Sequence, residues 1–177
     1  MHNGIWEKSN GHLLHDMNIL VIGYGRIGIA VAKILDAIGA NIFVYDPFIN
    51  QDILPDNITK INLNDGLKLA NIITIHSSGE DLILGEKEFD LMKSGVYILN
   101  AARGSLIDEY SLEKGLISGN IAGAWLDAYQ EEPYKGNLTK YSQVILTPHV
   151  GSYTIEGRKK MEIDCTKNLI KGLELLY

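Results

Sequence analysis

Arg103, Glu132 and His149 are the residues of this chain whose types suit acid–base chemistry on a small carboxylate. An arginine guanidinium binds a carboxylate through paired hydrogen bonds. A histidine imidazole changes charge near neutral pH, and an adjacent carboxylate favours its protonated form. Together these side chains would bind an anionic substrate and exchange a proton with an oxygen beside it.

Each residue also has an ordinary structural interpretation when it is taken alone. Arg103 would make a surface ion pair. Glu132 would belong to the turn before Pro133, and His149 would be a polar group at the end of a strand. Whether these residues are functional or only structural therefore depends on whether the fold brings the three side chains to one crevice.

Short apolar runs along the chain predict strands that are buried on both faces, as in a parallel sheet. The runs are 18–22, 42–45, 72–75, 96–99, 121–126 and 144–146, with a weaker one near 60–61. Helix-prone segments separate them, most clearly 27–38, where Ile27, Val31, Ile34, Leu35 and Ile38 recur at helical spacing. The alternation predicts an α/β fold with a doubly wound parallel sheet of the Rossmann type.

The pattern changes after residue 149 to one long helix, predicted over about 154–176. Met161, Cys165, Leu169 and Leu173 share one stripe of this helix. A stripe at that spacing is typical of a core or a subunit interface rather than a cofactor site. Cys165 is accordingly interpreted as a packing residue.

Length and composition favour one domain over 1–177, with no nucleic-acid or membrane partner. The 177 residues are enough for a single core. The net charge is −6 and the lysines are scattered, whereas nucleic-acid binding needs a concentrated positive surface. One cysteine excludes an intrachain disulfide, and the start resembles no secretory signal, so we expect a soluble cytoplasmic protein.

A glycine-rich turn, Gly23-Tyr24-Gly25-Arg26-Ile27-Gly28, lies between the first predicted strand and the first predicted helix. In that context the glycines permit a tight turn, close approach to a pyrophosphate and close packing of helix on strand. Asp46, at the end of the next strand, is placed to bind ribose hydroxyls and to repel a 2′-phosphate, which favours NAD over NADP. The alternative is that Asp46-Pro47 only begins a turn.

Arg103 follows a predicted strand directly, and Glu132 and His149 follow later strands. The carboxyl ends of parallel strands meet at one edge of the sheet, where ligands bind. All three side chains can therefore converge on one crevice although they are distant in sequence.

Three segments resemble, in order, the signatures of the NAD-dependent D-2-hydroxyacid dehydrogenases, the family that includes D-3-phosphoglycerate dehydrogenase. They are ARGSLIDE at 102–109, GAWLDAYQEEP at 123–133 and LTPHVGS at 146–152. With the glycine turn and MKSG at 92–95, the resemblance covers nearly the whole chain.

The resemblance implies hydride transfer between NAD(H) and C2 of a D-2-hydroxy acid or 2-keto acid. Arg103 corresponds to the arginine that binds the substrate carboxylate and carbonyl, His149 to the acid–base, and Glu132 to the carboxylate that orients it. Asp127 corresponds to the aspartate on the nicotinamide side. The full set of implied cofactor contacts is Gly23, Gly25, Arg26, Ile27, Gly28, Asp46, His76, Ser77, Ala101, Ala102, Arg103, Asp127, His149 and Gly151.

One motif departs from the family pattern. His76 is followed by Ser77-Ser78-Gly79-Glu80, where the family usually has a proline and then, two residues later, a threonine. Backbone groups and Ser77 would still border the nicotinamide ribose. We expect no metal at His76, since it has no partners at ligand spacing, and we expect His2, His12 and His15 to be solvated.

Family members ordinarily carry a second domain that forms the other wall of the cleft. We therefore expect this chain to bind NAD(H) but to turn over 2-keto acids weakly or not at all. The resemblance also implies a homodimer through the NAD-binding domain, for which the last helix and Trp6 are suited. An NAD(H)-sensing regulatory module, like the corepressors similar to these dehydrogenases, is the alternative, and the sequence leaves the particular substrate open.

Overall fold

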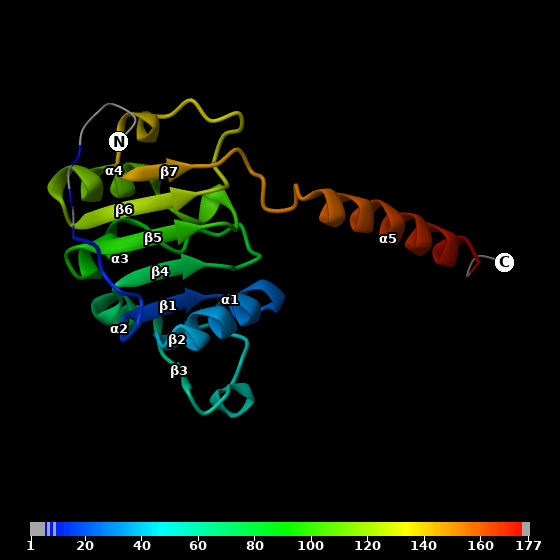
Figure 1. The fold of residues 1–177 in the computed structure, drawn as a ribbon, viewed down its shortest axis with the longest axis horizontal. Coiled ribbons are helices and arrows are strands. Elements are labelled where there is room, and N and C mark those ends of the chain that lie inside the picture. Colours follow the sequence, from blue (N-terminus) through cyan, green and yellow to red (C-terminus); the bar gives the residue numbers. More distant parts are fainter. Residues whose placement is uncertain (1–5, 7, 9, 175–177) are drawn as a thin grey trace.

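A seven-stranded parallel sheet forms the centre of the computed structural model, which describes residues 6, 8 and 10–174 (Figure 1). The strands are β1 (Asn18–Ile22), β2 (Asn41–Tyr45), β3 (Ile58–Lys60), β4 (Ile72–Ile75), β5 (Val96–Asn100), β6 (Ile121–Leu126) and β7 (Val144–Leu146). Their order is β3-β2-β1-β4-β5-β6-β7, so the direction of winding reverses between β1 and β4. The predicted doubly wound sheet is confirmed, and the weak run near 60–61 is β3.

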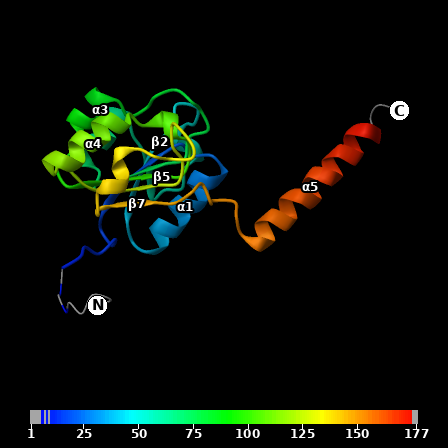
Figure 2. The same ribbon diagram turned by 90° about the horizontal axis from the view of Figure 1, so that it is seen from above.

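Helices cover both faces of the sheet. The covering helices are α1 (Arg26–Ala37), α2 (Leu63–Leu69), α3 (Glu86–Leu91) and α4 (Glu109–Ser118), and a fifth helix, α5 (Ile155–Glu174), covers neither face. Short 3₁₀ turns lie at Gln51–Ile53, Gly104–Leu106 and Asn137–Lys140. Figure 2 shows α3 and α4 on one face and α1 on the other. This division follows from the crossovers that parallel neighbours require.

Two hydrophobic clusters pack against the two faces. On the α2–α4 face, Ile73 and Ile98 of the sheet lie in one cluster with Leu67 of α2 and Leu112 of α4. On the α1 face, a second cluster includes Val21. All four residues of β4 are buried, which explains why its sequence is an almost unbroken apolar run.

Most of the predicted apolar stripe of α1 is turned away from the sheet, although Leu35 packs against the cluster on this face. Ile27 is 64% exposed, and Ile34 and Ile38 are also exposed, whereas the buried residues of α1 are Gly28 and Ala32. A Cβ on Gly28 would lie 2.1 Å from the carbonyl oxygen of Gly23. Small residues mark the inner side of this helix because it lies against the strand too closely for larger ones.

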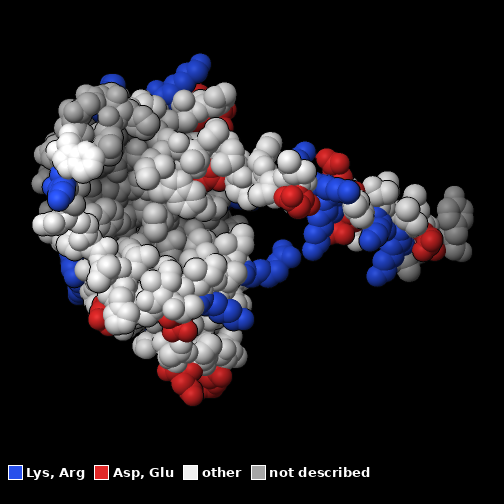
Figure 3. Space-filling view, viewed as in Figure 1, with Lys and Arg blue, Asp and Glu red and all other residues white. Residues whose placement is uncertain are grey.

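Half of the α1 face of the sheet is left without a covering helix among the described residues. Leu99, Trp125 and Ile145 are neighbours in register across β5, β6 and β7. Ile145 is 63% exposed, Tyr97 is exposed as well, and Leu99 and Trp125 are only half-buried. Figure 3 shows this side of the sheet as a hollowed and mostly uncharged surface. We call these four residues the open sheet face.

The long helix α5 projects away from the sheet (Figures 1 and 2). It begins one residue later than predicted and is described as far as Glu174. None of its residues is buried, and Cys165 is exposed, so packing of the stripe in the core of this chain is wrong, whereas packing of the stripe and Cys165 in a subunit interface stays a prediction. The predicted stripe exists but contacts no core within the described chain. None of the helices described is both long and apolar enough to cross a membrane.

Gly28→Ala is expected to destabilise the fold, since the added methyl would overlap the Gly23 carbonyl. Overpacking of this kind costs about 1–3 kcal/mol. Gly25→Ala is the matched control, because a Cβ there meets nothing within 4 Å. Urea unfolding measures both variants, and equal stabilities would contradict the close packing of α1 on β1.

Candidate active site

The glycine turn lets two backbone segments approach closely and leaves the start of α1 open to an anion. Gly23 has φ +89°, and a Cβ there would lie 2.7 Å from the backbone nitrogen of Ser77. Gly25 is the N-cap of α1, has no side-chain cap and faces open space. The first N–H groups of a 12-residue helix thus meet no capping side chain. Such a helix end suits a pyrophosphate, which is the fit expected for NAD.

Asp46 joins the end of β2 to this turn. Its Oδ2 accepts a hydrogen bond from the Tyr24 N–H at 2.8 Å, and its Oδ1 accepts one from the Phe48 N–H at 2.9 Å. The bond to Phe48 shows that Asp46 does begin a local turn. The bond to Tyr24 places the carboxylate directly beside the glycine turn, and each oxygen retains a lone pair for a further donor.

His76 and Ser77 pass next to Gly23 at the end of β4. His76 Nε2 lies 2.9 Å from the Thr74 hydroxyl oxygen, and burial lowers the pKa of His76. Within the described residues, no group of three or more His, Cys, Asp or Glu is placed to hold a metal ion. His12 is exposed and His15 pairs with Asp16 at the surface, as expected, whereas His2 lies outside the described residues.

Asn100, which the sequence analysis did not single out, shapes the segment that carries Arg103. Its Oδ1 accepts from the Ala102 N–H at 3.0 Å and its Nδ2 donates to the Arg103 carbonyl at 2.8 Å. Arg103 itself is exposed, and its Nη1 donates to the Ala102 carbonyl. The available signal was a polar residue that ends an apolar strand just before the arginine.

Gly104 brings this segment against the loop that leads to Glu132. A Cβ on Gly104 would lie 1.9 Å from the backbone carbon of Tyr129. No hydrogen bond or ion pair of the described residues joins Arg103 to Glu132 or His149. The arginine is linked to them through packed backbone rather than through its side chain.

Glu132 and His149, which are 17 positions apart, are joined by hydrogen bonds. His149 Nδ1 lies 3.0 and 3.1 Å from the two carboxylate oxygens. The hydrogen bond from His149 outweighs burial and, with one from the Tyr129 N–H, holds the pKa of Glu132 below its ordinary value. A carboxylate only accepts, so Nδ1 carries a hydrogen and Nε2 is the nitrogen left for a substrate. The side chain of His149 is 51% exposed and that of Glu132 is 40% exposed, so solvent reaches the pair.

Asp127 is 3% exposed and anchors the segment that carries His149. Its carboxylate accepts hydrogen bonds from the Thr147 hydroxyl at 2.6 Å and from the N–H groups of Val150 and Gly151 at 2.9 and 3.0 Å. Burial opposes its ionisation, but these bonds together outweigh burial and hold the pKa of Asp127 below its ordinary value. A charged aspartate is thereby fixed within the same loop cluster as the Glu132–His149 pair.

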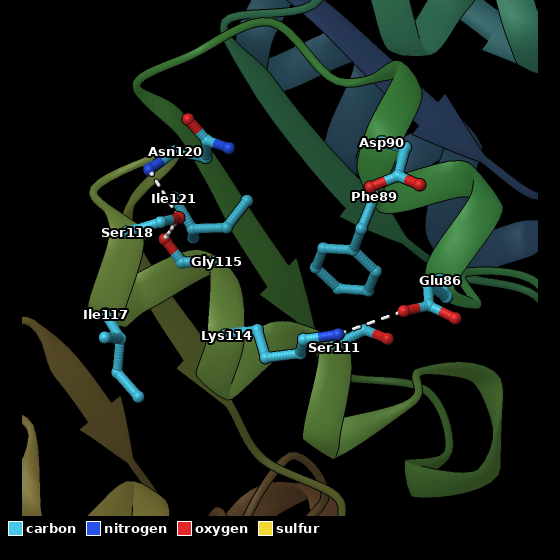
Figure 4. A pocket seen from close by; sticks show the side chains of 10 residues that line it. All are labelled: Glu86, Phe89, Asp90, Ser111, Lys114, Gly115, Ile117, Ser118, Asn120 and Ile121. Atoms are coloured by element: carbon cyan, nitrogen blue, oxygen red, sulfur yellow. Dashed lines mark hydrogen bonds and ion pairs between the residues drawn. The ribbon is translucent and has the colours of Figure 1, made fainter.

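One of the hollows on the described surface adjoins these residues, and a second one does not. The first, of about 610 Å³, is lined by Glu132 and His149 together with Tyr134, Leu146 and other neighbours. The second, of about 360 Å³, lies between α3 and α4, where Lys114 pairs with Glu86 at 3.0 Å (Figure 4). The hollow between α3 and α4 contains none of the predicted site residues, so we place the chemistry at the hollow lined by Glu132 and His149.

Comparison with known proteins agrees with the geometry. Residues 1–151 match the family model described as D-isomer specific 2-hydroxyacid dehydrogenase, NAD binding domain. The chain is 33% identical to a D-3-phosphoglycerate dehydrogenase of Dictyostelium discoideum over 97% of its own length and 44% of the relative's. It is 35% identical to a glyoxylate reductase of Thermofilum pendens over 97% of its own length and 54% of the relative's.

Solved structures show the same fold. A glyoxylate reductase from Paecilomyes thermophila superposes with a TM-score of 0.87 at 32% identity, over 95% of this chain and 52% of that one. An NAD-complexed D-isomer specific 2-hydroxyacid dehydrogenase from Lactobacillus delbrueckii ssp. bulgaricus gives 0.86 at 30% identity, over 98% and 58%. The chain thus spans about half the length of the relatives it matches.

Asp127→Asn is expected to lower the free energy of unfolding by roughly 2 kcal/mol or more at pH 7, because hydrogen bonds to a charged group contribute about 1.5–3 kcal/mol each. The native pKa lies below the ordinary 3.8, so the carboxylate's contribution is complete above pH 3.8 and is lost as pH falls through the native pKa. Urea unfolding of parent and variant should therefore show a difference that shrinks below pH 3.8. Asp52→Asn, on the exposed 51–53 turn, is the control, and a pH-independent difference would contradict the assignment.

Proposed function

Because this chain belongs to the D-isomer specific 2-hydroxyacid dehydrogenases, whose NAD-binding domain it matches, we propose that it supports hydride transfer between NAD(H) and a D-2-hydroxy acid or 2-keto acid. The observation that carries the proposal is the Glu132–His149 pair at 3.0 Å. The pair lies on loops at the carboxyl edge of the sheet, the edge from which the glycine turn also emerges. A cofactor site and an acid–base pair at one edge of the sheet are the parts that hydride transfer needs.

The proposed cofactor site extends from the glycine turn to the His149 segment. Free N–H groups at the start of α1 would hold the pyrophosphate, and the Asp46 carboxylate would accept bonds from the adenosine ribose hydroxyls. A 2′-phosphate would be repelled there, so NAD is the cofactor rather than NADP. Bound NAD(H) supplies or accepts the hydride at its nicotinamide.

The residues of the chain would manage the substrate and the proton. Arg103, exposed at the end of β5, would bind the substrate carboxylate and the carbonyl oxygen. His149 would give a proton from Nε2 to that oxygen during reduction and take it back during oxidation. Glu132 holds Nδ1 and stabilises the imidazolium. A positioned acid of this kind contributes about 10²–10⁴ in rate.

Turnover by the 177-residue chain itself is proposed to be slow. Glu132, His149 and Arg103 are open to water over the described surface. Efficient hydride transfer requires water to be excluded and the substrate to be held. The names of the relatives span phosphoglycerate, glyoxylate and lactate chemistry, so we propose the 2-hydroxy acid class, D-3-phosphoglycerate dehydrogenase-like, without naming one acid.

The further proposals are a cytoplasmic location and a homodimer through the NAD-binding domain. A single exposed cysteine suits a reducing compartment. The open sheet face and the uncovered apolar stripe of α5 support self-association, because large apolar surfaces of this kind are usually covered.

Asp46→Asn is expected to weaken NADH binding about 10–100-fold, because it removes the charge that meets the ribose hydroxyls. The preference of the chain for NADH over NADPH should become smaller for the same reason. Isothermal calorimetry with both nucleotides measures the change, and Asp52→Asn is the matched control on an exposed turn. NADH binding that is unaltered in Asp46→Asn would contradict the ribose assignment. No NADH binding by the parent would overturn the proposed function.

Ile145→Lys is expected to shift the chain from dimer to monomer in sedimentation velocity, because it places a charge in the open sheet face. Ile117→Lys is the control: Ile117 is 69% exposed but lies on α4, on the opposite face. A parent that is monomeric at high concentration, or equal behaviour of the two variants, would count against this interface.

A further inference from the structure

Thr147 forms hydrogen bonds at both its hydroxyl and its carbonyl, two residues before His149. The hydroxyl donates to Oδ1 of Asp127 at 2.6 Å and accepts from Nε1 of Trp125 at 3.1 Å. The carbonyl accepts from the Tyr129 hydroxyl at 2.8 Å and from the His149 N–H at 2.9 Å. Thr147 is therefore tied at once to the buried carboxylate, to the loop that leads to Glu132 and to His149.

The backbone of His149 adopts a conformation that needs support from its surroundings. Its φ is +52°, in the left-handed region that residues other than glycine seldom adopt. On one side its N–H closes a tight turn onto the Thr147 carbonyl. On the other side Val150 and Gly151 are bonded to Asp127. Both flanks of the turn are thus fixed to a single buried carboxylate.

We propose that Thr147 is a positioning residue for His149: its hydroxyl and the Asp127 carboxylate form a clamp that sets the His149 turn so that Nδ1 meets Glu132 and Nε2 stays free. The role of the clamp in catalysis rests on the proposed function, whereas the hydrogen bonds that form the clamp do not depend on it. An imidazole released from this turn would lose its fixed partner at Nδ1. It would then present a mixture of tautomers to a substrate.

The clamp also gives Asp127 a role of its own in this chain. Three donors already occupy its carboxylate, and two of them are the backbone N–H groups of Val150 and Gly151, the two residues that follow His149. The third is the Thr147 hydroxyl, which is the shortest of the three bonds. If Thr147 were only structural, it would pack in its place and accept the hydrogen bond from Trp125, and its replacement would not change the tautomer of the His149 ring.

The experiment reads the His149 ring directly in the whole 177-residue chain. Nitrogen-15 NMR in alkaline buffer distinguishes a ring with hydrogen fixed on Nδ1 from a ring that exchanges between tautomers. Thr147→Val removes the hydroxyl, and Thr147→Ser keeps it. Thr139→Val is the matched control, because Thr139 lines the same hollow but its hydroxyl bonds only the nearby Gly136 carbonyl.

The clamp predicts the single Nδ1–H signature in the parent, in Thr147→Ser and in Thr139→Val, and its loss in Thr147→Val. A mixture of tautomers in the parent, or an unchanged signature in Thr147→Val, overturns the proposal. If Thr147→Val does not fold, Asp127→Asn tests the other end of the same bond: loss of the signature supports the clamp and its retention overturns it. NADH binding is measured in parallel, so failure of the proposed function is recognised separately.

Discussion

The buried carboxylate of Asp127 is the group on which the arrangement of the site depends. A charged side chain that is 3% exposed is stable only when donors surround it, and here the donors come from one short segment, 147–151. The same hydrogen bonds therefore both stabilise the charge of Asp127 and fix the position of His149. The segment cannot move away without leaving a buried charge unsatisfied.

Glycines provide the second constraint, since they allow backbone segments to meet where side chains would keep them apart. Gly23 admits the end of β4, Gly28 admits the start of α1, and Gly104 admits the loop that follows β6. The first two shape the proposed cofactor site, and the third joins the Arg103 segment to the loop of Glu132.

The sheet and the position of the glycine turn were predictable from the sequence because both depend on local signals. Mostly apolar runs marked the strands, and the spacing of Gly23, Gly25 and Gly28 marked the turn. The Glu132–His149 contact was anticipated through the order of strands and through family resemblance, not through proximity in sequence.

Other features depend on contacts that no local pattern encodes. The apolar stripe of α1 was visible, but only the packing shows that Gly28 and Ala32 are the buried residues of the helix while Ile27 is exposed. The roles of Asn100 and Thr147 arise from hydrogen bonds to groups brought together by the fold. Likewise, the periodicity of α5 indicated an apolar stripe but could not indicate what, if anything, packs on it.

The most direct test of the central claim is transfer of deuterium from NADH labelled at C4 to C2 of a 2-keto acid, followed by mass spectrometry over long incubations. We expect slow but measurable transfer by the parent chain, at least about 10²-fold faster than by His149→Gln, because a positioned acid contributes that much. Equal transfer by the two proteins would contradict the claim that His149, held by Glu132 and anchored through Asp127, is the acid–base of a hydride-transfer site.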